Sequence, residues 1–353
     1  MAIEKLPGAL SDYTTLRVGG QAKSTLRVTT EQELIDVVQD LDQQGENLLI
    51  LGGGSNVVCG DYEFPGTVII IGTEGVDWFG GTVKVAAGEN WDEFVRNTID
   101  RGFGQLAPLS GIPGSMGATP IQNIGAYGVE IAEFIVELDV WDRENSEQRI
   151  LTVLECEFEY RDSELKRNPN RFVVLAVTLK LESTLSIPIE YQQLANVMKQ
   201  EIGTVAQAAE VREQVMHLRA TKSMVLDSAD ADSNSTGSFF INPVVQIAQI
   251  PANCPSFSLN KDDPRYPSHV KLSAAWLIEK AGITKGFSLG NGDSPIRVSR
   301  NHSLAITNPG QGSSHHVVEL ASYVRQQVFN RFDIELSVEP VLVNCQLDPL
   351  QRS

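Results

Sequence analysis

Two glycine-rich stretches are the strongest candidates in this sequence for binding a phosphate-bearing ligand. In the first, residues 52–56, three glycines, a serine and an asparagine end the apolar run "NLLIL". In the second, residues 110–128, Gly111, Gly114 and Gly117 recur at every third position. Glycine lets a ligand approach the main chain, and successive backbone N–H groups bind pyrophosphate without a lysine. Glycines also build plain strand-ending turns, and their spacing alone leaves both readings open.

Neither stretch matches a standard nucleotide-binding motif. No Gly-Lys-Ser/Thr follows the glycines, which excludes a Walker A loop. The glycines of residues 110–128 do not lie between a clear strand and a long helix, which excludes the dinucleotide fingerprint. Ser110, Ser115 and Thr119 add hydroxyl groups that could bind a phosphate.

Three further residues, Arg161, Ser238 and Glu339, carry a guanidinium, a hydroxyl and a carboxyl group, which can bind ions or move protons. Each also has an ordinary structural explanation: a surface ion pair for Arg161, a turn for Ser238, and an exposed strand end for Glu339.

The elements that must position these residues indicate a mixed α/β chain. Thr30 and Glu33 form a capping box, and apolar residues follow it at helical spacing. Residues 105–128 hold too many glycines and prolines for a long regular element. The stretch 227–235 is polar and predicts an exposed loop or a boundary. The other predicted elements are a buried strand in "NLLILGGG", strands over 66–71, 82–88, 134–142 and 171–182, and a helix over 90–102. Later in the chain come helices over 271–282 and 315–332 and a strand over 332–343.

Composition and charge narrow the class of protein. The 353 residues suffice for two or three domains, and a formal net charge of −17 argues against a broad surface for nucleic acid or anionic membrane. No run approaches the ~18 apolar residues of a membrane span, and "MAIEKLPGAL" lacks an apolar signal segment. The four cysteines lie far apart, which predicts reduced thiols, no metal site and a cytoplasmic protein.

Six ordered blocks resemble one enzyme family. These blocks are "LGGGSNVV", "SGIPGSMGATPIQNIGAYGVEI", "YRDSELK", "GSFFINPVV", "KLSAAWLIEKAG" and "VEP". They occur in the order found in UDP-N-acetylenolpyruvoylglucosamine reductases, flavoenzymes of the peptidoglycan pathway, and the resemblance runs from Thr15 to Glu339. Tyr191 in "IEYQQL" resembles the branch that closes a tyrosine-bearing loop over its substrate.

The resemblance implies an α+β fold, with a two-part α/β FAD-binding domain of the vanillyl-alcohol-oxidase type and a third α/β domain for substrate. Residues 1–66 and 334–353 would form the first FAD-binding subdomain, 67–223 the second, and 224–333 the substrate domain. The implied FAD cradle comprises Gly52, Gly53, Gly54, Ser55, Asn56, Ser110, Gly111, Ile112, Pro113, Gly114, Gly117, Ala118, Thr119, Asn123, Gly125 and Ala126.

The implied reaction reduces UDP-N-acetylglucosamine enolpyruvate to UDP-N-acetylmuramate with NADPH as co-substrate. NADPH would reduce FAD at N5, and the hydride would then add to the vinyl carbon of the substrate. By resemblance, Arg161 and Glu339 hold and polarise the substrate carboxylate, and Ser238 protonates the resulting carbanion. Related flavin folds often anchor FAD through a histidine or cysteine. Neither cradle loop contains one, so we expect dissociable FAD.

The diphosphate and uridine of the substrate need cations and amides. The candidates are Tyr191, Arg219, Lys222, Asn242 and His302, although Arg219 and Lys222 would also suit a solvated helix end and His302 a structural role. We expect a monomer whose only partners are small molecules.

The chain departs from the family pattern at several positions. Ile241 replaces a common lysine, Ala118 replaces a common serine, and the stretch before Ser238 is long and acidic, which weakens the assignment of Lys222. Two alternatives remain open: an FAD-dependent alcohol oxidase on the same scaffold, and a non-catalytic flavin or sugar-nucleotide binder.

Overall fold

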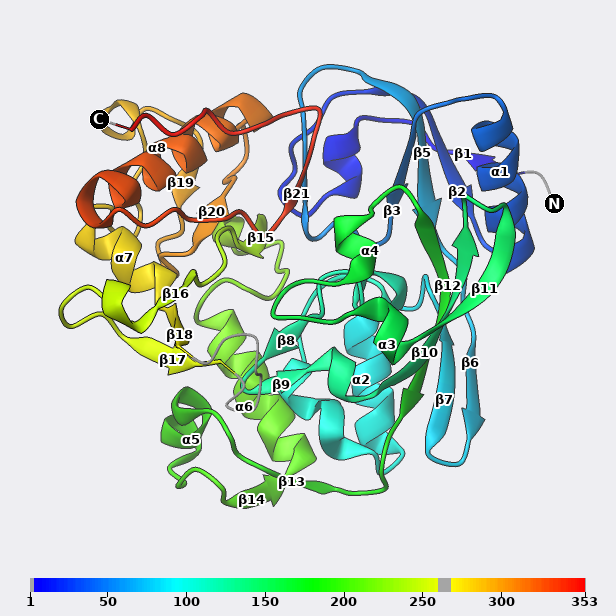
Figure 1. Ribbon diagram of the computed structural model, residues 1–353, viewed down its shortest axis with the longest axis horizontal. Helices are drawn as coiled ribbons and strands as arrows, with labels where there is room; N and C mark the ends of the chain where they lie inside the picture. Colours follow the sequence, from blue (N-terminus) through cyan, green and yellow to red (C-terminus); the bar gives the residue numbers. More distant parts are fainter. Residues whose placement is uncertain (1–2, 260–267, 353) are drawn as a thin grey trace. The chain divides into compact units, whose positions relative to one another are not determined.

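A computed structural model describes residues 3–259 and 268–352 (Figure 1). The chain divides into two compact units. Unit 1 comprises Met1–Gly8, Ala22–Gly54 and Phe64–Val225, and unit 2 comprises Ala9–Gln21, Ser55–Glu63 and Leu226–Ser353. The first glycine-rich loop therefore changes unit between Gly54 and Ser55.

The first glycine-rich loop directly follows β3, a strand of the first sheet of unit 1. The strands of this sheet run in the order β1-β2-β5-β3, and β2, β5 and β3 are parallel. The predicted cap of α1 is confirmed, because the Thr30 side chain accepts the N–H of Glu33. The predicted strand before the loop is also confirmed, but as an edge strand only its last residue, Leu51, is buried. The elements are β1 (Glu4–Lys5), β2 (Ala22–Val28), α1 (Glu31–Gln43), β3 (Leu48–Leu51) and β5 (Phe64–Ile71).

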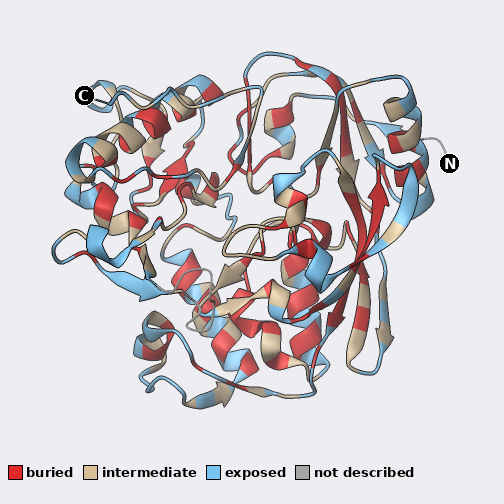
Figure 2. Ribbon diagram, viewed as in Figure 1, coloured by how far each residue is buried: buried red, intermediate tan, exposed pale blue. Residues whose placement is uncertain are grey.

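The second sheet of unit 1 is antiparallel, in the order β11-β10-β12-β7-β6. β12 is buried over most of its length because both faces are covered (Figure 2). Val173 and Leu175 join the core beneath α1, while Val174 and Val177 join the core around α2 and α6. The elements are β6 (Val76–Phe79), β7 (Thr82–Ala86), α2 (Trp91–Asp100), β10 (Ile135–Asp142), β11 (Glu147–Thr152), β12 (Phe172–Lys180) and α6 (Ala208–Ala220).

The region of residues 104–133 contains only short elements, as its glycines and prolines predicted. They are η2 (Gly104–Leu109), η3 (Met116–Ala118), β8 (Gly125–Ala126), β9 (Val129–Glu130) and η4 (Ile131–Glu133). The rest of unit 1 contributes α3 (Val153–Cys156), α4 (Glu164–Arg167), β13 (Ser186–Pro188), α5 (Gln192–Met198) and β14 (Val205–Gln207).

Unit 2 has its own apolar core, formed by α8, α7 and two aromatic residues, Phe239 and Phe240. Asp61 caps α8 by accepting the backbone N–H groups of Ser314 and His315. Its sheets are β15-β20-β19, β16-β18-β17 and the parallel pair β4-β21. The elements are η1 (Leu10–Tyr13), β4 (Val57–Cys59), η5 (Ala231–Ser233), β15 (Ser235–Ser238), β16 (Val244–Gln246), η6 (Ile247–Gln249), β17 (Ser256–Ser258), β18 (His269–Leu272), α7 (Ala274–Lys280), η7 (Gly290–Gly292), β19 (Arg297–Val298), β20 (Ala305–Thr307), α8 (Ser314–Phe332) and β21 (Val341–Val343).

Three predictions for this unit are wrong in part. The helix predicted over 271–282 begins only at Ala274, because the preceding residues belong to β18 and Ser273 caps the helix. The strand predicted over 332–343 is regular only in β21. Ile334 and Leu336 are buried as their alternation indicated, but among the described residues this segment pairs only through an isolated bridge of Val338 with Phe240 before β21 begins. The stretch 227–235 follows the change of unit between Val225 and Leu226, as a boundary would, but it is not a uniformly exposed loop. Asp227–Ala229 and Ala231 are exposed, whereas Asp232 and Ser235 are buried.

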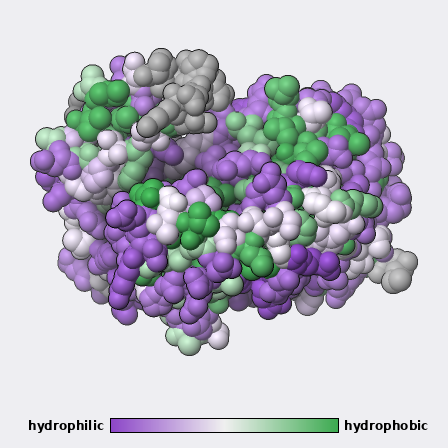
Figure 3. All heavy atoms as spheres, turned by 90° about the horizontal axis from the view of Figure 1, so that it is seen from below, coloured by the Kyte–Doolittle hydropathy of each residue, from purple (hydrophilic) through white to green (hydrophobic). Residues whose placement is uncertain are grey.

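Two further features match the sequence analysis within the described residues. All four cysteines are free, and burial raises the pKa of Cys59 and of Cys156 to about 12. Among the helices described, none combines the length and apolar character that a membrane crossing requires. The face in Figure 3 shows hydrophobic side chains in separate groups among hydrophilic ones.

Candidate active site

The two glycine-rich loops lie backbone against backbone in unit 1. A Cβ added at Gly53 would come within 2.8 Å of the Gly114 Cα, and one at Gly52 within 2.1 Å of the Ser115 Oγ. Only glycine permits this approach, because nothing in the Gly114 backbone can rotate away from a side chain. The sequence motifs that suggested a cradle are therefore brought together.

The paired loops leave several backbone donors unused. The N–H groups of Gly53, Gly54, Ile112, Gly114 and Ser115 donate no hydrogen bond to any residue that the structure describes. Neighbouring N–H groups of this kind can form an anion-binding nest, and a negative ligand would satisfy the donors of Gly54 and Ser115, which are buried. This arrangement fits the pyrophosphate of a dinucleotide cofactor.

Charged side chains from two helices hold the start of the second loop. Asp92 of α2 accepts the Gly111 N–H at 2.6 Å, and Arg219 of α6 donates to the Gly111 carbonyl at 3.0 Å. Arg212 holds Asp92 with two bonds, at 2.6 and 2.8 Å. Arg219 is 8% exposed, so it is not a solvated helix end, and desolvation lowers the pKa of its guanidinium. The role of Asp92 was not predicted from the sequence. An acidic residue in the first turn of a helix is common, and nothing in the sequence links it to Gly111.

Two hydroxyls that the sequence offered for phosphate binding are directed inward. Ser110 donates to the Ala107 carbonyl at 2.7 Å, and Thr119 donates to the Met116 carbonyl at 2.8 Å. Both residues are buried. Their hydrogens close local turns, so the cradle consists mainly of backbone.

Arg161 is held beneath the end of the second loop. Its guanidinium donates to the carbonyls of Asn123, at 3.3 Å, and Gly125, and lies 3.7 Å from the Glu130 carboxylate. Its neighbour Asp162 pairs with Arg167 at 2.5 Å instead, so a simple surface ion pair does not account for Arg161.

The backbone around Arg161 is strained at two positions. Arg161 and Asn123 have φ values of 57° and 43°, in the left-handed region, and such strain gathers at functional sites. The Asn123 amide donates to Glu130 at 2.9 Å and to the Glu159 carbonyl at 3.0 Å, so this side chain holds the loop.

A second group of predicted residues lies around α5. Tyr191, the residue before the helix, meets Tyr127 edge to face at 5.6 Å between ring centroids. Lys222 donates to Gln193 at 2.8 Å. Burial raises the pKa of Tyr127, so its hydroxyl keeps its proton and remains a hydrogen-bond donor at neutral pH.

In unit 2, Ser238 and Glu339 lie on adjacent extended segments. Glu339 donates its N–H to the carbonyl of Phe239 at 2.9 Å, and Phe240 forms a bridge with Val338. Ser238 ends β15 just after a register shift, and Gly237 has a φ of 73°. A bulge of this kind commonly turns a side chain at an active site.

Asn56 also contacts the Glu339 segment. Its Nδ2 donates to the Glu339 carbonyl at 3.3 Å, and its own carbonyl accepts the Val341 N–H at 3.0 Å. The Asn242 side chain accepts the Ala274 N–H at the start of α7, and the backbone carbonyl of His302 accepts the Ala305 N–H.

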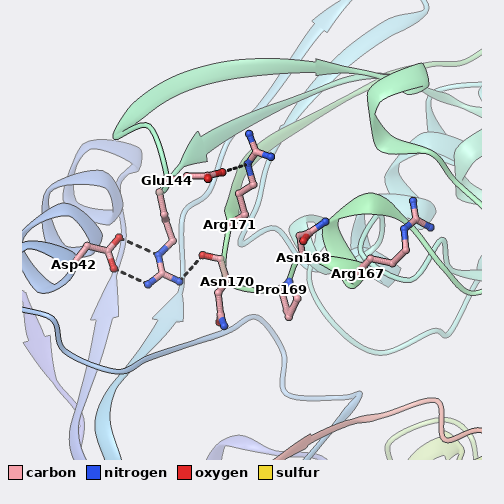
Figure 4. A pocket seen from close by; sticks show the side chains of 8 residues that line it. Asp42, Glu144, Arg167, Asn168, Pro169, Asn170 and Arg171 are labelled. Carbon is pink, nitrogen blue, oxygen red and sulfur yellow. Dashed lines mark hydrogen bonds and ion pairs between the residues drawn. The ribbon is translucent and has the colours of Figure 1, made fainter.

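An arginine-lined pocket of about 670 Å³ in unit 1 contains none of the predicted site residues (Figure 4). Its cations are already neutralised: Arg143 pairs with Asp42 at 2.6 Å and Arg171 with Glu144 at 3.2 Å. Anions would have to displace these carboxylates, so this pocket is a weaker candidate than the paired loops. Its lining residues are Asp42, Arg143, Glu144, Arg167, Asn168, Pro169, Asn170 and Arg171.

Comparison with known proteins agrees with this geometry. Residues 22–151 match the profile of an FAD binding domain, and residues 229–343 match the C-terminal domain of UDP-N-acetylenolpyruvoylglucosamine reductase. The enzyme of that name from Cutibacterium acnes is 44% identical over 96% of this chain and 90% of its own length. The one from Nocardia farcinica is 45% identical over 96% and 89%. The crystal structure of the Thermus caldophilus reductase shares the fold, with a TM-score of 0.67, 24% identity, and coverage of 97% of this chain and 99% of that one. The chain therefore belongs to the UDP-N-acetylenolpyruvoylglucosamine reductase family.

Proposed function

We propose that this protein reduces UDP-N-acetylglucosamine enolpyruvate to UDP-N-acetylmuramate with NADPH, as a cytoplasmic monomer in peptidoglycan precursor synthesis. Relatives that carry the name of this activity align over 96% of the chain at 44% and 45% identity. The paired glycine loops supply the second line of support, because their unused N–H groups suit the pyrophosphate of FAD.

The cradle of Gly52–Asn56 and residues 110–126 would hold FAD without a covalent bond, since it contains neither histidine nor cysteine. Bound FAD would supply the hydride-transfer chemistry between NADPH and the vinyl carbon of the substrate. The protein's part is to present backbone N–H groups to the pyrophosphate. Asp92 and Arg219 hold that backbone in place, so we assign Arg219 to the loop rather than to the substrate diphosphate.

We propose that Arg161, Glu339 and Ser238 act on one substrate molecule. Arg161 binds the substrate carboxylate with its planar guanidinium, which the loop carbonyls orient. Glu339 polarises the same carboxylate. Ser238 gives its hydroxyl proton to the carbanion next to that carboxylate, and the carbanion is basic enough to take it.

The remaining candidates would bind the rest of the substrate. Tyr191 and Lys222 lie together near α5 and suit the diphosphate, as in the branch of the family with a tyrosine-bearing loop. Asn242 and His302 are proposed for the uridine. The division into subdomains 1–66 with 334–353, 67–223 and 224–333 is part of this proposal.

One observation supports the proposed catalytic roles most strongly. The Glu339 N–H donates to the carbonyl of Phe239, the residue after Ser238, so the backbones of Ser238 and Glu339 lie side by side. A Ser238→Ala variant tests these roles by separating the two half-reactions. NADPH should still remove the flavin absorbance, but its recovery on adding substrate should slow by about 10³-fold. Ser228→Ala, in an exposed part of the same stretch, should behave as wild type. Recovery at the wild-type rate in Ser238→Ala would remove Ser238 from the mechanism.

A further inference from the structure

Asp232, six residues before Ser238, is a buried carboxylate with no role in the proposed mechanism. Its Oδ1 accepts two bonds from Arg297, from Nη2 at 2.6 Å and from Nε at 3.2 Å. Its Oδ2 accepts the Arg300 N–H at 2.7 Å and the Ser299 hydroxyl at 3.2 Å. The Asp232 side chain is 5% exposed, so four donors surround a buried acid.

The charge balance shows that Asp232 is ionised. Desolvation would raise its pKa, but the hydrogen bonds from Arg297 and from the Arg300 N–H outweigh it, and the pKa lies below its ordinary value. A buried ion pair of this kind is costly to break from one side, because the remaining charge stays buried without a partner. Asp232 is thus neutralised by Arg297, and it presents no free negative charge to an anionic substrate.

The pair joins the entry of β15 to the far strand of its sheet. Arg297 of β19 lies opposite Thr307 of β20, and Thr307 lies opposite Ser235 of β15. One rung therefore crosses all three strands. Asp232 lies three residues before Ser235 and binds the far end of that rung.

Successive bonds lead from Asp232 to Ser238. The Asn234 carbonyl accepts the N–H of Asn308 at 2.9 Å, and the Ser235 carbonyl accepts the hydroxyl of Thr15 at 2.7 Å. The Ser235 hydroxyl then accepts the Gly237 N–H at 3.1 Å, which fixes the bulge. This bulge sets the orientation of the Ser238 side chain. The position of the bulge is set in turn by the residue at which β15 starts to pair with β20.

We propose that the Asp232–Arg297 pair positions Ser238 by setting the register at which β15 enters its bulge. This inference rests on the proposed function, in which Ser238 donates the proton. It predicts that the pair acts only on the step that needs Ser238, and that Asp232 touches no reacting atom.

The test compares half-reactions in Asp232→Asn and in Asp227→Asn as a matched control. Asparagine keeps the shape but turns an amide donor toward the donors around it, so β15 shifts. Recovery of flavin absorbance by substrate should slow by about 10²-fold, the cost of misplacing a reacting group by ~1 Å. Reduction by NADPH should change less than about twofold, and the solvent deuterium isotope effect on recovery should rise as proton transfer becomes limiting. Asp227 is exposed in the same stretch, so its variant should match wild type.

A double variant separates positioning from general damage. In a Ser238→Ala background, Asp232→Asn should slow recovery no further, because residues that act as a unit are not additive. Further slowing there, or equal slowing of both half-reactions in Asp232→Asn alone, would overturn the inference. If Ser238→Ala alone recovers at the wild-type rate, the proposed role of Ser238 fails, and the positioning role falls with it. If Ser238→Ala is slow but Asp232→Asn is not, only the positioning role falls.

A milder variant covers the case in which Asp232→Asn does not fold. Arg297→Lys keeps the positive charge but replaces a two-bond contact with a single donor, and should slow recovery by about tenfold. Amide hydrogen exchange gives an independent readout in the same variant. Exchange should rise at residues 235–239 and stay unchanged in α8. Unchanged exchange with wild-type recovery would contradict the proposal.

Discussion

The glycine cradle of unit 1 and the Ser238–Glu339 region of unit 2 are built by opposite means. In the cradle, two loops touch through backbone, and the hydroxyls of Ser110 and Thr119 donate to the carbonyls of Ala107 and Met116. In unit 2, the proposed site depends on the side chains of Ser238 and Glu339, and bonds such as Asp232–Arg297 hold the backbone of β15. We therefore expect FAD binding by the cradle to be impaired by substitutions that add a side chain. We expect the Ser238–Glu339 region to be impaired by substitutions that remove one.

The largest effect expected from this comparison is in Gly53→Ala. The new Cβ would lie 2.8 Å from the Gly114 Cα, which cannot give way without moving the second loop. The loss of one or two charge-assisted N–H contacts should weaken FAD binding by about 10² to 10³-fold. Titration of the apoprotein with FAD measures this affinity.

Gly52→Ala is the matched control for that experiment. Its Cβ would meet the Ser115 Oγ, the rotatable end of a side chain, so the loss of FAD affinity should be clearly smaller. Equal FAD binding by Gly53→Ala and wild type would show that the two loops do not form the cradle.

Arg161→Lys examines the one long side chain that the proposal assigns to catalysis in unit 1. A lysine has a single donor group and cannot hold the carbonyls of Asn123 and Gly125 together with a substrate carboxylate. Recovery of flavin absorbance by substrate should slow by about 10²-fold, while reduction by NADPH stays near the wild-type rate. Arg167→Lys, whose partners Asp162, Glu157 and Glu164 are all partly or largely exposed, should change either step less than about twofold. An equal loss in both lysine variants would contradict a specific role for Arg161.

Asp142 gives a smaller effect, on stability rather than on activity. Burial raises its pKa, but hydrogen bonds from Arg171, Asn145 and Arg149 outweigh this and lower it from 3.8 to about 2. The stability that this carboxylate contributes is therefore complete above pH 3.8 and is lost as the pH falls to about 2. Chemical denaturation over this pH range should show a steeper loss of stability in wild type than in Asp142→Asn. Parallel curves for the two proteins would refute the assignment.

The smallest effect is expected from Ser110→Ala. Its hydroxyl donates to the Ala107 carbonyl, so its removal should cost about 1 kcal/mol of stability and leave FAD affinity within about twofold. A large loss of FAD affinity would show that side chains, and not only backbone, build the cradle.

Glycine spacing marked both loops as possible ligand sites but left a plain turn open, and only the resemblance to the reductase family joined Gly52–Asn56 and Gly111–Ala126 in one cradle. The structure brings Gly53 against Gly114, as that pairing requires, and the Thr30 cap of α1 followed from a local pattern. Local signals of this kind need no knowledge of distant partners.

The supporting contacts could not be predicted, because each joins residues far apart in the chain. Asp232 looked like part of an exposed acidic loop, yet Arg297, 65 residues away, buries it. Asp92 and Arg219 hold Gly111 from two separate helices. The alternation at Ile334 and Leu336 indicated burial correctly but could not show that, among the described residues, this segment pairs only briefly, through the bridge of Val338 with Phe240.

The visible spectrum of the purified wild-type protein under anaerobic conditions reports both half-reactions of the proposed enzyme in one experiment. The protein should carry flavin absorbance, lose it when NADPH is added, and regain it when UDP-N-acetylglucosamine enolpyruvate follows. A colourless protein that binds no FAD would contradict the account, as would a flavin that regains its absorbance only when oxygen is admitted.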